Sequence, residues 1–198
     1  MGKKKDTFLN MTLSLIAITL VAGISLGYVN ELTVGPKAKA KLEKKINALK
    51  LVLPAFDSSP VADIQMIKSP SVKDSIEIYP AFENNIFVGA AVIGSTEKGF
   101  SGLIKIMVGF EENGDIFNIE VLEQKETPGL GTKIKNDSFI EQFRGKNPET
   151  NNLKVKKDGG EIDALTGATI TSRAFGEAAQ MAYEAFKKNE ESLKTLKN

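Results

Sequence analysis

The hydrophobic pattern opens with an uncharged, largely apolar run at residues 8–29. At about 1.5 Å per residue, a helix of this length crosses a hydrocarbon core of about 30 Å. The basic residues 3–5 precede the run, so the positive-inside rule predicts a cytoplasmic N-terminus and an extracytoplasmic chain after Asn30. A cleaved signal peptide is the alternative, but the run is longer than a typical signal core and ends in a poor cleavage site. The pattern therefore predicts that residues 1–30 form the cytoplasmic N-terminus and a single transmembrane anchor.

An amphipathic pattern follows the anchor. Pro36 is suited to the first position of a helix, and Leu42, Ile46 and Leu49 recur at helical spacing. These residues predict a linker helix within 31–56. Its lysines are interpreted as a solvated face, with contact to anionic lipid headgroups as the alternative.

The middle of the chain contains short apolar and alternating segments that are typical of β-strands. Asn113-Gly114, between two apolar runs, is a strong signal for a hairpin. After it, Phe117, Ile119 and Val121 alternate with polar residues, which predicts that these three side chains share one buried face. The predicted strands are 75–79, 86–94, 103–110 and 116–122.

The last part of the chain returns to helical periodicity, in a helix that we expect to begin near Thr171. The apolar stripe of this helix consists of Phe175, Ala179, Ala182 and Phe186. This order of elements predicts an α+β fold, in which helices cover one side of an antiparallel sheet. The expected domain covers residues 57–188, and residues 189–198 are expected to form a polar tail.

Composition narrows the chemistry of this domain. The 198-residue chain has no Cys and no His, so it lacks disulfides, thiolate nucleophiles, Cys-ligated iron–sulfur clusters and the commonest metal ligand. We therefore predict no metal site and expect any redox chemistry to use a borrowed cofactor. The balance of 26 basic and 25 acidic residues leaves no electrostatic footprint for nucleic acid.

A segment rich in small and hydroxyl residues, 163–172, lies where the final helix is expected to begin. Gly167 and Ala168 leave the backbone open to close approach, and a helix N-terminus offers unpaired N–H groups to a phosphate. The segment lacks the spacing and the lysine of a P-loop. Physical reasoning alone favours a plainer interpretation, in which Thr171 or Ser172 caps the helix and Gly167 forms a turn.

Three motifs nevertheless carry a family resemblance. Residues 163–169, Asp-Ala-Leu-Thr-Gly-Ala-Thr, resemble the flavinylation motif Asp-x-x-(Ser/Thr)-Gly-Ala-Thr of the FMN-binding domain family. Residues 98–102, Lys-Gly-Phe-Ser-Gly, resemble its glycine-aromatic strand entry, and residues 126–131, Glu-Thr-Pro-Gly-Leu-Gly, resemble its ETPGLG loop. Gln124 is a departure, because many members of the family carry His there. Three motifs in the family's order make the resemblance specific.

The resemblance implies that a flavin transferase takes FMN from FAD and joins it to Thr169 as a phosphoester. It also implies that Asp163 belongs to the pattern that the transferase recognises, and that the ETPGLG loop lies against the flavin ring. The cofactor-binding residues implied in this way are Thr166, Gly167, Ala168, Thr169, Thr171, Ser172, Glu126, Thr127, Gly129, Leu130 and Gly131. No catalytic residue is implied, and the chain alone is not expected to catalyse a reaction.

With the anchor included, the chain resembles the G subunits of Rnf-type ion-translocating ferredoxin:NAD oxidoreductase complexes over nearly its whole length. This implies an electron carrier in the bacterial cytoplasmic (inner) membrane, with its domain on the periplasmic side. Its implied partners are integral membrane subunits of a complex that transports Na⁺ or H⁺. The alternatives are the C subunit of the sodium-pumping NADH:quinone reductase, a non-redox assembly subunit and a free-standing flavoenzyme.

Overall fold

The computed structural model describes residues 8–67 and 75–196. The basic residues 3–5, on which the predicted orientation depends, lie outside the described residues. The chain divides into two compact units, Met1–Lys44 and Lys45–Asn198.

The first unit is formed by the greater part of one long helix, α1 (Phe8–Val52). Among the described residues, α1 is the one helix that is long and apolar enough to cross a membrane, and residues 8–29 within it are exposed. Its beginning therefore fits the predicted anchor. Pro36 lies inside α1, so the prediction that Pro36 opens a separate linker helix was wrong. A proline removes one backbone hydrogen bond, and the lysines and alanines that follow it are good helix formers that continue the helix.

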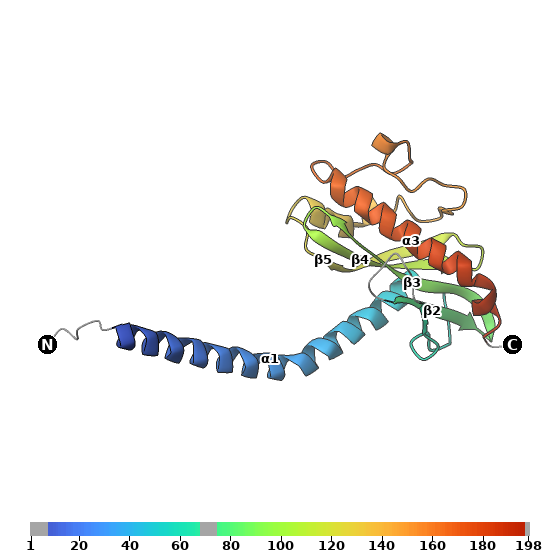
Figure 1. Ribbon diagram of the computed structural model, residues 1–198. Helices are drawn as coiled ribbons and strands as arrows, with labels where there is room; N and C mark the ends of the chain where they lie inside the picture. Colours follow the sequence, from blue (N-terminus) through green and yellow to red (C-terminus); the bar gives the residue numbers. More distant parts are fainter. Residues whose placement is uncertain (1–7, 68–74, 197–198) are drawn as a thin grey trace. The chain divides into compact units, whose positions relative to one another are not determined.

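The second unit is built on one antiparallel sheet whose strands follow each other in sequence order (Figure 1). The strands are β1 (Gln65–Ile67), β2 (Ile76–Glu83), β3 (Ile86–Gly99), β4 (Gly102–Glu111) and β5 (Ile116–Gln124). This arrangement confirms the predicted fold class. β4 and β5 are joined as a hairpin through Asn113 and Gly114, as predicted, and Gly114 has a φ of 89°. β3 runs further than predicted, and Gly99 pairs with Gly102 where β3 turns into β4.

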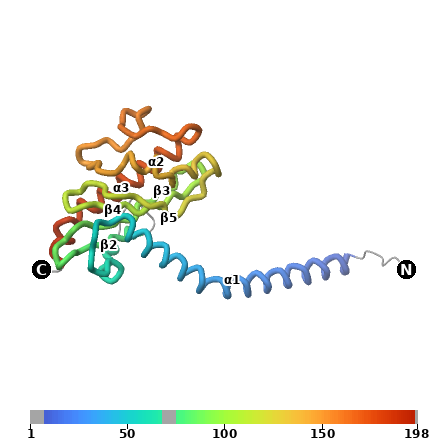
Figure 2. The backbone as a smooth tube through the Cα atoms, turned by 180° about the vertical axis from the view of Figure 1, so that it is seen from behind, coloured from blue at the N-terminus to red at the C-terminus, as the bar shows by residue number. Residues whose placement is uncertain are grey.

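One face of the sheet is covered by helix α3 (Thr169–Lys194), as Figures 1 and 2 show from opposite sides. The predicted apolar stripe of α3 is fully buried against the sheet. The helix backbone comes close to β3, because a Cβ atom at Gly94 would lie 2.1 Å from the Ala178 carbonyl oxygen. Between β5 and α3 the chain forms the short helices η1 (Gly131–Lys135), α2 (Asp137–Ile140) and η2 (Lys156–Asp158).

The opposite face of the sheet is covered by the end of α1, residues 45–52. Ala48, Leu49 and Val52 join a second buried cluster there, and a Cβ atom at Gly109 would lie 1.6 Å from the Val52 carbonyl oxygen. The domain therefore begins at Lys45, inside the expected linker helix, rather than at residue 57. Both faces of the sheet are covered, not one as predicted, because α1 continues into the domain.

Two predictions in the domain were wrong in detail. Phe117 is 39% exposed while Ile116 is buried, because the pairing of β4 and β5 shifts register between Gly109 and Phe110. Gly109 pairs with Asn118 and Phe110 with Ile116, so Phe117 is the extra residue of a bulge in β5 and its side chain turns outward. The expected polar tail is helical as far as Lys194, and its Leu193 is buried, since α3 continues along the edge of the core.

Candidate functional site

The three motif segments meet around one cavity of about 300 Å³ at the N-terminal end of α3. One wall comes from the β3–β4 turn, one from the loop at 126–131 and one from the residues that open α3. The residues that line the cavity are Phe100, Glu126, Thr127, Leu130, Gly131, Gly167, Ala168, Thr169, Ile170 and Thr171. Glu126 is hydrogen-bonded to Ser101, 25 residues before it, and to Thr171, 45 residues after it. Segments that are distant in the sequence therefore form a single site.

Thr169 is the first residue of α3, two residues earlier than the sequence predicted. Its side chain is half-buried and lines the cavity. Within the described part of the chain, no hydrogen bond of the Thr169 hydroxyl is observed, which leaves its oxygen available to a group in the cavity.

No side chain caps the first turn of α3. The N-cap position belongs to Ala168, which has no polar side chain, so the interpretation of Thr171 or Ser172 as the cap was wrong. The Ser172 hydroxyl instead accepts a hydrogen bond from the Leu165 N–H at 3.0 Å and donates one to the Ala168 carbonyl at 3.0 Å. It thereby holds the turn before the helix. The residues that open α3 line the cavity, so the positive end of the helix dipole lies at its wall.

The turn that precedes Thr169 needs a glycine. Gly167 has a φ of 76°, a conformation that side chains with a Cβ rarely adopt. A Cβ atom there would also lie 3.3 Å from Leu130 Cδ2, across the cavity wall. Gly167 thus brings the threonine segment and the ETPGLG loop close together.

Glu126 joins all three motifs. It is only 4% exposed, and its Oε1 accepts a hydrogen bond from the Ser101 N–H at 3.1 Å, while its Oε2 accepts one from the Thr171 hydroxyl at 2.7 Å. A Cβ atom at Gly131 would lie 2.7 Å from Oε2, and one at Gly99 would lie 2.6 Å from Oε1. The two glycines therefore leave room for the carboxylate to sit between the loop, the strand turn and the helix.

The ETPGLG loop is also held by its own hydrogen bonds. The Leu130 N–H donates to the Thr127 carbonyl at 3.2 Å, and the Gly129 N–H donates to the Thr132 hydroxyl at 3.0 Å. Gln124, the departure from the family pattern, accepts a hydrogen bond from the Glu126 N–H through its side-chain oxygen. An amide at this position supports the start of the loop without entering the cavity.

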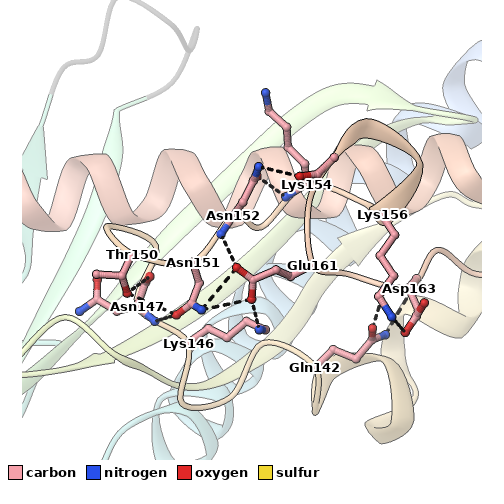
Figure 3. Close-up of polar contacts among 11 residues, drawn as sticks. Gln142, Lys146, Asn147, Thr150, Asn151, Asn152, Lys154, Lys156, Glu161 and Asp163 are labelled. Atoms are coloured by element: carbon pink, nitrogen blue, oxygen red, sulfur yellow. Dashed lines mark hydrogen bonds and ion pairs between the residues drawn. The ribbon is translucent and has the colours of Figure 1, made fainter.

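Asp163 lies away from the cavity, on the exposed loop that leads to Thr169 (Figure 3). Its carboxylate pairs with Lys156 at 2.7 Å, and its backbone exchanges two hydrogen bonds with the Gln142 side chain. In the same loop Glu161 accepts hydrogen bonds from the Lys146 ammonium, the Asn151 side chain and the Asn152 N–H. The Lys146 ammonium, the first of these partners, holds the pKa of Glu161 below its usual range. These contacts fix the loop that presents the threonine segment.

The structure thus brings together most of the predicted site residues, but not all of them. Thr166, Gly129 and Asp163 do not line the cavity, and Ser172 is buried beneath it. Two lining residues were absent from the predicted set, namely Phe100 and Ile170. They form an apolar rim with Leu130, and the three side chains are 66%, 48% and 43% exposed. An isoleucine next to the motif threonine and an aromatic residue at a strand turn were the signals that the sequence offered.

The chain is similar in sequence to a known family of domains and to several known proteins. Residues 99–184 match the family described as FMN-binding domain. The G subunit of the ion-translocating oxidoreductase complex of Aliivibrio fischeri is 34% identical over 197 residues, which cover 94% of this chain and 93% of that protein. The G subunit of the Na(+)-translocating ferredoxin:NAD(+) oxidoreductase complex of Acetobacterium woodii is 30% identical, with 88% and 89% covered. Among solved structures, NqrC from Shewanella oneidensis is similar with a TM-score of 0.49 and 21% identity, covering 66% of this chain and 69% of that one.

Proposed function

The chain belongs to the family of G subunits of ion-translocating oxidoreductase complexes and contains an FMN-binding domain, and from this premise we propose that it carries one FMN covalently on Thr169. It is a membrane-anchored electron-transport flavoprotein subunit. The observation that carries the proposal is the convergence of three motif segments on one cavity, with the Thr169 side chain in its wall.

The residues at the cavity fit a flavin mononucleotide. The Thr169 hydroxyl and the uncapped first turn of α3 suit a phosphoryl group, because that turn offers N–H groups and a positive dipole end. The apolar rim of Phe100, Leu130 and Ile170 suits a flat aromatic ring. Bound there, FMN would supply reversible electron transfer, while the protein supplies orientation and electrostatics.

The attachment reaction is a transfer of FMN from FAD to the threonine, with AMP as the leaving group. The Thr169 oxygen forms a bond to the phosphorus on the FMN side of the FAD pyrophosphate, the pyrophosphate bond breaks and AMP leaves. The hydroxyl proton passes to the transferase or to water. A carrier bound in this way is not lost outside the cytoplasm, where we place the domain.

In the complete complex, we place this protein between redox groups of integral membrane subunits, and the complex couples the transfer of electrons to transport of Na⁺ or H⁺. The anchor keeps the domain near those partners. A topology reporter fused to the C-terminus tests the orientation. Reporter activity on the cytoplasmic side would contradict the extracytoplasmic placement.

The covalent site is tested with Thr169→Ala, with Thr195→Ala, an exposed threonine outside the motif segments, as the matched control. Each full-length variant is produced with a flavin transferase, separated by denaturing electrophoresis and inspected for flavin fluorescence on the band. We expect the wild type and Thr195→Ala to fluoresce and Thr169→Ala to be dark, with peptide mass spectrometry locating the FMN increment at Thr169. A dark wild type would favour the alternative of a non-redox assembly subunit.

A further inference from the structure

Arg173 lies one helical turn beyond Thr169 on the outer side of α3. Residues four apart on a helix are neighbours on its surface, and long helical side chains lean toward the N-terminus. Arg173 and Thr169 are therefore neighbours on the surface of α3. Arg173 is also the one basic residue in the segment 169–176.

The guanidinium of Arg173 is already held in place by an acceptor. Its Nε donates to Asp158 Oδ2 at 2.6 Å, and its Nη2 donates to Asp158 Oδ1 at 2.8 Å. This bidentate pair holds the pKa of Asp158 below its usual range. It uses two of the five N–H donors of the guanidinium, and the Arg173 side chain remains 46% exposed. Donors for a second anion therefore remain.

We propose that Arg173 is a positioning residue for the phosphoryl group on Thr169, to which its guanidinium donates one or more hydrogen bonds. The proposal rests on the proposed covalent attachment. A phosphodiester carries one negative charge, and Arg forms directional, charge-assisted hydrogen bonds with phosphate oxygens.

If Arg173 only stabilised the loop, Arg173→Ala and Asp158→Ala would have the same effect. The pair with Asp158 ties the loop before Thr169 to α3, so its loss would loosen the loop whichever partner is removed. Asp158→Ala breaks the same ion pair but leaves the guanidinium and removes its competing acceptor. Arg173→Ala breaks the pair and removes the guanidinium. The two variants therefore separate support of the loop from contact with phosphate.

The experiment uses the full-length chain in detergent, unmodified at the start, with FAD and a limiting amount of flavin transferase. The initial rate of FMN attachment is read from flavin fluorescence on denaturing gels. We expect Arg173→Ala to be at least about tenfold slower than the wild type, since one charge-assisted hydrogen bond accounts for a factor of this order. We expect Asp158→Ala to be as fast as the wild type or faster, and Arg173→Lys to fall between.

The loaded proteins give a second reading, the ³¹P chemical shift of the phosphoester, which does not depend on activity. We expect the resonance to move in Arg173→Ala and to move less in Asp158→Ala. The proposal would be overturned if Arg173→Ala and Asp158→Ala had the same attachment rate and the same ³¹P shift. It would also be overturned if Arg173→Ala were slower but kept the wild-type ³¹P shift, because Arg173 would then contact the transferase rather than the phosphoryl group. If Arg173→Ala does not fold, Arg173→Lys against Asp158→Ala decides by the same criteria. A wild type without FMN on Thr169 would instead overturn the proposed function itself.

Discussion

Removing the Glu126 carboxylate should destabilise the domain, because a buried hydroxyl and a part-buried backbone N–H donate to it. In Glu126→Ala, the Ser101 N–H and the Thr171 hydroxyl both lose their acceptor. The unsatisfied buried hydroxyl costs about 1–3 kcal/mol, and loss of the hydrogen bond from the exposed residue Ser101 adds about 1 kcal/mol. Water entering from the adjoining cavity satisfies part of this loss. We therefore expect a decrease of about 2–4 kcal/mol in the free energy of unfolding.

Glu126→Gln separates the hydrogen bonds from the charge. An amide can accept from the Ser101 N–H through its oxygen and donate to the Thr171 hydroxyl through its nitrogen. Both contacts then persist without a charged partner, and hydrogen bonds to charged groups are stronger by about 1 kcal/mol. We expect Glu126→Gln to lose about that amount, well below the loss in Glu126→Ala.

The assay is thermal unfolding of the unmodified full-length chain in detergent. The near-ultraviolet circular dichroism of Tyr79 and Tyr183 reports on the domain, because both rings are buried there. For a domain of this size, about 2–4 °C per kcal/mol converts the expected losses into about 5–15 °C for Glu126→Ala and about 2–4 °C for Glu126→Gln. Glu184→Ala, an exposed substitution on α3, is the control. A Glu126→Ala melting temperature within about 2 °C of that control would refute the reasoning.

Two further predictions concern close packing and pH. Gly131→Ala would place its Cβ atom 2.7 Å from Glu126 Oε2 and 2.9 Å from Thr171 Oγ1. We therefore expect the free energy of unfolding, measured by thermal unfolding, to fall by about 1–3 kcal/mol. The control Gly35→Ala, where a Cβ atom meets no atom within 4 Å, should have little effect. Burial raises the pKa of Glu77, but its hydrogen bonds from Lys45 and Tyr79 outweigh burial, so the net pKa lies below the ordinary 4.5. The stabilisation by Glu77 is therefore complete above pH 4.5 and is lost as pH falls through the lowered pKa. Urea midpoints of wild type and Glu77→Gln should differ most at neutral pH and converge in acid, and a constant difference would contradict the shift.

The sequence predicted those parts of the fold that depend on local pattern. The hairpin at Asn113 and Gly114, the apolar stripe of α3 and the uncharged run of the anchor each follow from the spacing of a few neighbouring residues. The errors arose where tertiary contacts decided the outcome. The end of α1 belongs to the domain because Gly109 lets the Val52 backbone approach the sheet. Phe117 is exposed because it is the extra residue of a bulge in β5, between the paired residues Ile116 and Asn118.

In the site, too, some features could be predicted from the sequence and others depend on tertiary contacts. The motif threonine and its loop were predictable by resemblance, but the reason why the three motifs occur together was not, because Ser101 and Thr171 lie 25 and 45 residues from Glu126. One buried carboxylate needs a strand turn that offers a backbone N–H, a helix that offers a hydroxyl, and glycines that leave room for its oxygens. A change in any one of these leaves a buried charge or a buried donor without its partner, at a cost of about 1–3 kcal/mol or more. The three segments are therefore constrained together by the geometry of Glu126, in addition to any contact that each makes with a flavin.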